Sequence, residues 1–91
     1  MKSYFLVDLE SVPVAEEALR ARLPGQEQPW VLRSPSGDPI AYFNVGDKLD
    51  GETVVHVQAD VSGRHHNDDT AVLGVLRNLQ ASIGGVVTGD A

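Results

Sequence analysis

The stretch Thr53-Val54-Val55-His56-Val57-Gln58-Ala59-Asp60-Val61 shows the most regular alternation of side chains in the chain. From Val55 onward, apolar residues occupy every second position, and His56, Gln58 and Asp60 lie between them. Because successive side chains of a β-strand point to opposite faces, this period of two predicts a strand with one buried and one polar face. We expect this strand to run through the middle of a sheet, with its valines against a helical layer and His56 turned away from that layer.

Three other segments nearer the N-terminus have strand character. Residues 30–33 and 40–45 flank the turn-forming residues 34–39 and predict a hairpin, followed by a loop over 46–51. Residues 3–9 are rich in aromatic and β-branched side chains and predict a largely buried strand. Alternation along this strand gives one face with Phe5, Val7 and Leu9 and another with Tyr4, Leu6 and Asp8.

Two helices are predicted, each with recognisable signals at its ends. Ser11 can cap the first helix, Pro13 suits its first turn, and Pro24-Gly25 ends it. Asn67 is the expected cap of the second helix, and Gly84-Gly85 stops it, because glycine accepts the left-handed backbone that closes a helix. The buried stripe of the second helix is expected to be Val72, Val75, Leu76, Leu79 and Ile83.

The resulting element order, β-α-β-β-β-α-β, predicts an α+β fold. It resembles a ferredoxin-like α/β plait (β-α-β-β-α-β) that carries one extra strand, a resemblance that covers most of the chain but includes no sequence motif. In that plait each helix joins two parallel strands with a third strand between them. The resemblance therefore implies a mainly antiparallel sheet with two helices on one face, and the strand order 85–88, 3–9, 53–61, 39–45, 30–33.

Composition narrows the classes of function. The chain has 91 residues, no cysteine, seven Lys+Arg and thirteen Asp+Glu, for a net charge of −6. These numbers predict a single domain over residues 1–91 and exclude disulfides and Cys-ligated metals. The acidic balance argues against nucleic-acid binding, and no apolar stretch approaches the roughly 20 residues of a membrane span. We expect a cytoplasmic protein with no cofactor and no metal.

The face of the predicted sheet that no helix covers is the first candidate site. A contiguous apolar patch on such a face tends to mark a partner surface. We therefore expect a non-catalytic binding or self-assembly module, with a second copy of the chain or another protein as its partner. The candidate interface residues are Tyr4, Leu6, Tyr42 and His56, with Ile40, Val54, Gln58 and Trp30 on the same face.

The loop between the strand 53–61 and the second helix is the alternative site. It places Asp60, Arg64, His65 and His66 close together in sequence, at a position where functional loops often lie. Its acids also suit a plain helix start, which needs no ligand. The predicted topology brings this loop, the hairpin loop 34–38 and both chain ends to one end of the sheet, where Arg33 would join the lining of a polar pocket.

Three chemistries are open for that loop. A metal ion would need ligands that converge, whereas adjacent histidines usually diverge and no HExxH spacing is present. An anion could be bound by Arg64 and the free N–H groups of a helix start, although Asp68 and Asp69 would repel it. A histidine could transfer protons, although no positioned nucleophile accompanies it. The alternative hypothesis is thus a small enzyme or a metal- or anion-dependent ligand binder, with unassigned catalytic residues. Taken together, these sequence features favour a protein that is not an enzyme.

Overall fold

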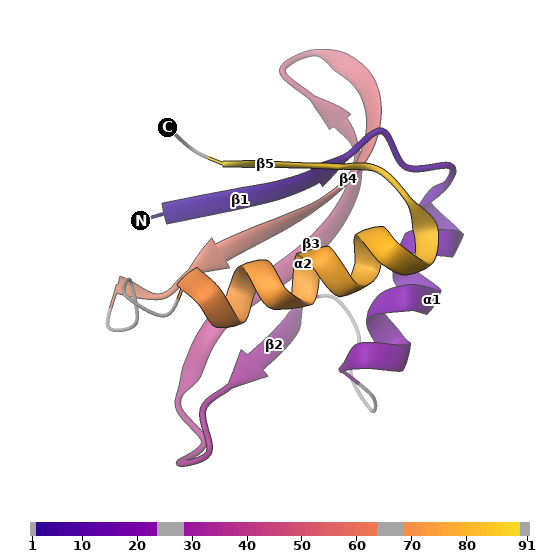
Figure 1. Cartoon of the computed structure of the whole chain (residues 1–91). Helices are drawn as coiled ribbons and strands as arrows, with labels where there is room; N and C mark the ends of the chain where they lie inside the picture. Colours follow the sequence, from indigo (N-terminus) through magenta and orange to yellow (C-terminus); the bar gives the residue numbers. More distant parts are fainter. Residues whose placement is uncertain (1, 24–28, 64–68, 90–91) are drawn as a thin grey trace.

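The computed structural model describes residues 2–23, 29–63 and 69–89, which form a five-stranded antiparallel sheet and two helices (Figure 1). The strands lie across the sheet in the order β2-β3-β4-β1-β5, which confirms the predicted order. The elements are β1 (Lys2–Val7), α1 (Val12–Arg22), β2 (Trp30–Arg33), β3 (Pro39–Leu49), β4 (Glu52–Val61), α2 (Asp69–Ile83) and β5 (Val86–Gly89).

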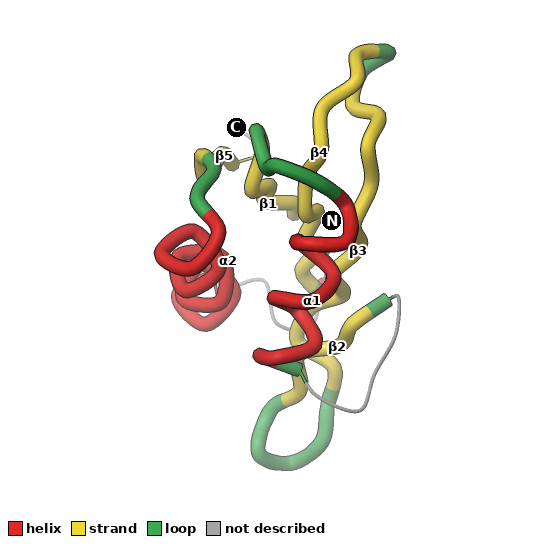
Figure 2. The backbone as a smooth tube through the Cα atoms, turned by 90° about the vertical axis from the view of Figure 1, so that its right-hand side faces the viewer, coloured by secondary structure: helices red, strands yellow, loops and turns green. Residues whose placement is uncertain are grey.

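Both helices lie on the same side of the sheet, as Figures 1 and 2 show from two directions. Helix α1 packs on β3 and β4, whereas α2 packs on β1, β4 and β5. Helix α2 joins β4 to β5, which run parallel with β1 between them, because β1 is antiparallel to both. Within the described ranges, no helix has the length and apolar character needed to cross a membrane.

The helix ends follow the local signals in the sequence. The Ser11 side chain caps α1 by accepting a hydrogen bond from the Val14 backbone N–H at 3.3 Å. At the C-terminal end of α2, the Gly84 N–H donates to the Gln80 carbonyl at 2.8 Å. Gly84 and Gly85 both have positive φ angles, which end the helix as predicted. Asn67, the predicted cap of α2, lies outside the described residues.

The hairpin of β3 and β4 is longer than the sequence analysis predicted. Residues 46–49 were expected in a loop, but they continue β3, and Leu49 pairs with Glu52 across the turn. The two turn residues are Asp50 and Gly51, with φ angles of 52° and 80°. Positive φ at both central positions defines a type I′ turn, for which Asp-Gly is a preferred sequence. That dipeptide was the available signal for the longer hairpin.

The core forms between the helices and the face of the sheet beneath them. Strand β4 is the central strand, and its Val57, Ala59 and Val61 side chains are completely buried on the helix side. His56 lies on the opposite face, so the main prediction for this segment is confirmed. The buried apolar residues are Leu6, Leu9, Ala15, Leu19, Trp30, Ile40, Ala41, Phe43, Val45, Val57, Ala59, Val61, Val72, Leu76 and Leu79.

The predicted faces of β1 were wrong. Leu6 pairs with Val57, so the two side chains share the helix side of the sheet, and Leu6 is completely buried. Phe5 and Val7 therefore point to the uncovered side. Asp8 then adopts a left-handed conformation with φ 60°, which breaks the alternation and returns Leu9 to the core. Both faces of this segment are apolar, so periodicity alone could not choose between them.

Candidate functional site

The side of the sheet turned away from the helices forms an uncovered surface, which we call the open face. The strand registers place alternate residues of all five strands on it. Among the described segments, none lies over this side (Figure 2). The open face consists of Ser3, Phe5, Val7, Val31, Tyr42, Asn44, Gly46, Val54, His56, Gln58, Asp60, Val86 and Thr88.

Apolar side chains dominate one part of the open face. Tyr42 is 37% exposed and Val86 is 50% exposed, and they are the exposed large hydrophobic residues of the described chain. Phe5, Val7 and Val54 on the same face are half-buried. Of these residues, the sequence analysis placed Tyr42 and Val54 on the uncovered side, and it missed the other three because the faces of β1 were exchanged and β5 was not assigned faces. The apolar part of the open face thus consists largely of other residues than expected.

His56 lies on the open face as predicted, but its ring is buried, with 6% exposure. The Nδ1 atom is 2.9 Å from the Val54 carbonyl oxygen. A carbonyl only accepts hydrogen bonds, so the neutral ring must carry its proton on Nδ1 and leave Nε2 as an acceptor. Phe5 lies beside the ring, with centroids 6.2 Å apart. Gly46 lies across from it, and a Cβ atom there would be 3.0 Å from Cε1 of His56. The absent side chain of Gly46 therefore makes room for the imidazole.

Asp60 is held by neutral donors on the open face. The Ser3 hydroxyl donates to Asp60 Oδ1 at 2.7 Å, and the Gln58 amide donates to the same oxygen at 2.9 Å. This arrangement does not by itself form a ligand-binding or catalytic site. In the described part of the chain, no cluster of three His, Cys, Asp or Glu residues is placed to hold a metal ion.

The rest of the predicted polar pocket is only partly described. Arg64, His65 and His66 lie outside the described residues. Arg33 donates to the Gly37 carbonyl at 3.0 Å and so closes its own hairpin loop. The predicted meeting of chain segments at one end of the sheet is confirmed for the described part, because Val61 pairs with both Lys2 and Ala41.

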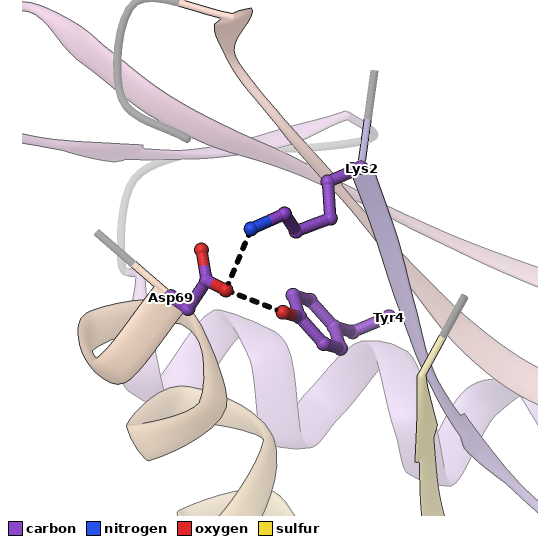
Figure 3. Close-up of polar contacts among 3 residues, drawn as sticks. All are labelled: Lys2, Tyr4 and Asp69. Carbon is purple, nitrogen blue, oxygen red and sulfur yellow. Dashed lines mark hydrogen bonds and ion pairs between the residues drawn. The ribbon is translucent and has the colours of Figure 1, made fainter. Parts of the chain in front are cut away.

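Four predicted interface residues are buried or lie on the helix side. Leu6 and Tyr4 are on the helix side, and Ile40 and Trp30 are buried in the core. The Tyr4 hydroxyl donates to Asp69 Oδ2 at 2.6 Å, and the Lys2 ammonium lies 2.8 Å from the same oxygen (Figure 3). These contacts join the start of β1 to the start of α2. Tyr4 and Leu6 therefore stabilise the packing of α2 on the sheet and are not available on the open face.

The contacts to Asp69 raise two pKa values. The hydrogen bond to Asp69 raises the pKa of Tyr4 above 10.0, and the hydrogen bond to Asp69 also raises the pKa of Lys2 above 10.5. Both groups are more easily kept protonated in the folded state than in the unfolded chain. Their contribution to stability is therefore present below about pH 10 and is lost as the pH rises through the raised pKa values.

The alkaline titration of Tyr4 tests these contacts. In a Tyr42→Phe background, Tyr4 is the remaining tyrosine, and we expect its absorbance transition to lie above the 10.0 of a free tyrosine. Adding Asp69→Asn should move the midpoint down, because the amide removes the negative charge that opposes tyrosinate. A midpoint that Asp69→Asn leaves unchanged would show that the contact does not form in solution.

A shallow groove lies between the two helices, on the opposite side of the molecule from the open face. Its volume is about 260 Å³, and Val14, Glu17, Ala18, Ala21, Ser82 and Ile83 line it. This volume is below the roughly 300–1,000 Å³ of typical small-molecule sites. Glu17 is the one ionisable residue of the lining, so the groove holds no pair of groups arranged for acid–base chemistry.

Comparisons of the chain with protein-family models, with curated proteins and with solved structures found no match. The functional argument therefore depends on the open face itself.

Proposed function

We propose that this chain is a non-catalytic binding module that associates with a second copy of itself through the open face. The observation that carries the proposal is a sheet face that no described segment covers, on which Tyr42 and Val86 expose large apolar side chains. Large apolar side chains exposed on an uncovered face are typical of a partner surface.

The dimensions of the open face suit an interface. With about 4.8 Å between strands and about 3.4 Å per residue, five strands of roughly six residues span on the order of 500 Å². A pair of copies would thus cover on the order of 1,000 Å², the lower limit expected for a specific interface. A two-fold axis brings the same patch of each copy together, so the open face of one copy must be complementary to the open face of the other.

The charge distribution favours a second copy of the chain. The whole chain carries a net charge of −6, so most approaches of two copies bring acidic surfaces together. In its central rows, from Tyr42 to Gly46 on β3, the open face holds a single acidic side chain and no Lys or Arg, whereas Arg33, Lys48 and Glu52 lie at the strand ends beyond the register shifts. That acid, Asp60, already accepts hydrogen bonds from Ser3 and Gln58. Because charged residues are depleted from the centres of protein interfaces, the open face is the surface on which two acidic copies can meet.

Tyr42→Lys tests the proposal. Tyr42 is the cross-strand partner of Asp60, so the new ammonium gains a nearby carboxylate in the monomer, which should keep its fold. In the dimer the same charge would be desolvated, and we expect the dissociation constant to rise by about tenfold or more. Sedimentation equilibrium at micromolar protein measures the change, and circular dichroism checks the fold.

Ala81→Lys is the matched control, because it adds the same charge at an exposed position of α2 on the helix side. Both substitutions make the chain less acidic, so a general charge effect would strengthen association in both variants. The proposal requires the weakening to occur in Tyr42→Lys alone. A wild-type chain that stays monomeric across the concentration range, or equal behaviour of the two variants, would refute it.

We further propose that the fold is a variant of the ferredoxin-like plait with an additional edge strand. The strand order and the connection from β4 through α2 to the parallel strand β5 support this assignment. Helix α1 departs from the plait pattern because it leads to β2, which lies at the far edge, before the chain returns through β3.

A further inference from the structure

His56 is the one buried polar side chain among the described residues. It lies on the central strand, near the middle of the open face, which none of the described segments covers. Its burial comes from immediate neighbours, with Phe5 beside the ring and Gly46 across from it. An ionisable group in this position would lie inside the contact if two open faces met.

The hydrogen bond of His56 fixes which nitrogen of the neutral ring carries the proton. Nδ1–H donates to the Val54 carbonyl, which leaves Nε2 as the atom that would take up a second proton. Protonation would add an N–H donor and a positive charge at Nε2. In a monomer, water can reach that group only through the small exposed part of the ring, and a partner seated on the face would exclude this water as well.

Among the described residues, no charged side chain forms an ion pair with the His56 ring. The elements beside it contribute uncharged side chains to the open face, namely Phe5 and Val7 from β1, Asn44 and Gly46 from β3, and Val54 and Gln58 from β4. The charged groups nearest in register are Asp47 and Lys48 on β3, Glu52 and Asp60 on β4, and Asp8 after β1. No ion pair joins any of these groups to the ring.

We infer that His56 makes the association of two open faces sensitive to acid, so that the neutral ring permits the dimer and protonation favours the monomer. This inference depends on the proposed self-association and adds a means of regulating it. Histidine is the side chain whose charge ordinarily changes near neutral pH. By linkage, a proton that favours the monomer must also bind less readily to the dimer.

The first experiment compares the dissociation constant at about pH 7.5 and about pH 5.5, where histidine changes its charge and most carboxylates do not. For the wild type we expect dimerisation to weaken by about tenfold or more at the lower pH, as a charge without a partner enters the contact. His56→Gln should lose this response. It should associate equally well or better at low pH, because His65 and His66 still gain charge and reduce the net negative charge.

The outcomes separate the two proposals. A wild-type dimer of equal strength at both pH values would refute the role of His56 and leave self-association in place. A monomer at both pH values would instead refute the self-association on which that role depends. Weakening of the same size in His56→Gln would assign the response to another group and also refute the inference.

A second measurement on the wild type removes any dependence on the folding of the His56→Gln variant. The imidazole protons of His56 can be followed by NMR during a pH titration at a low and a high protein concentration. We expect the midpoint of this titration to fall at the higher concentration, because the dimer disfavours the second proton. A midpoint that does not change with concentration, in a sample shown to dimerise, would refute the inference.

Discussion

Replacing Gly85 by alanine is expected to destabilise the protein by about 3–4 kcal/mol, because two costs fall on the same residue. Gly85 has a φ angle of +96°, a conformation that a residue with a Cβ atom adopts at a cost. The added Cβ would also lie 2.7 Å from the Val7 carbonyl oxygen and 2.8 Å from Cδ2 of Leu9. Because one of these neighbours is backbone, relief requires β5 or β1 to move.

Gly84→Ala separates the two costs. Gly84 has a similar φ angle of +79°, but nothing lies within 4 Å of the position of its Cβ. We expect this control to lose only the conformational part, about 1–2 kcal/mol. Thermal unfolding measures both variants, and Gly85→Ala should lower Tm by about 15 °C, given roughly 4–8 °C per kcal/mol for a chain of this size. Equal losses in the two variants would show that β5 does not pack closely on β1.

The second large effect is expected from Leu6→Ala, which should cost about 3 kcal/mol as a fully buried leucine leaves a cavity. Leu6 is completely buried beneath the helices. Its neighbour Val7 is half-buried on the open face, so Val7→Ala should cost only about 1 kcal/mol. Chemical denaturation measures the free energy of unfolding of both variants. A larger loss for Val7→Ala would reverse the faces of β1 and with them the composition of the open face.

The order of the elements and the position of β4 followed from local patterns. The alternation through 53–61 predicted a central strand with His56 away from the helices, and the structure confirms this placement. The start of α1 at Ser11 and the end of α2 at Gly84 were also correct, since each depends on hydrogen bonds within a few residues. Such signals act over one turn of chain and can be recognised without knowledge of the fold.

The candidate site was only partly predictable. Tyr42 and His56 do lie on the open face, but Tyr4 and Leu6 lie beneath α2. Phe5 lies on the open face, where Tyr4 and Leu6 were expected. Residues 3–9 have apolar side chains on both faces, and in that case a shift of one residue in register exchanges the faces. The pairing of β1 with β4 settles the register, and that pairing joins segments about fifty residues apart.

The amino-acid sequence alone determines the order of the elements, the start of α1 and the end of α2, because alternation, a serine cap and a glycine that ends a helix are properties of neighbouring residues. Only the tertiary structure decides which face of β1 is buried and how His56 is enclosed. Gly46 provides the space for the imidazole because it lies across from His56 in the register of β3 and β4. Burial at such positions is set by contacts between strands, so it emerges when the sheet has formed.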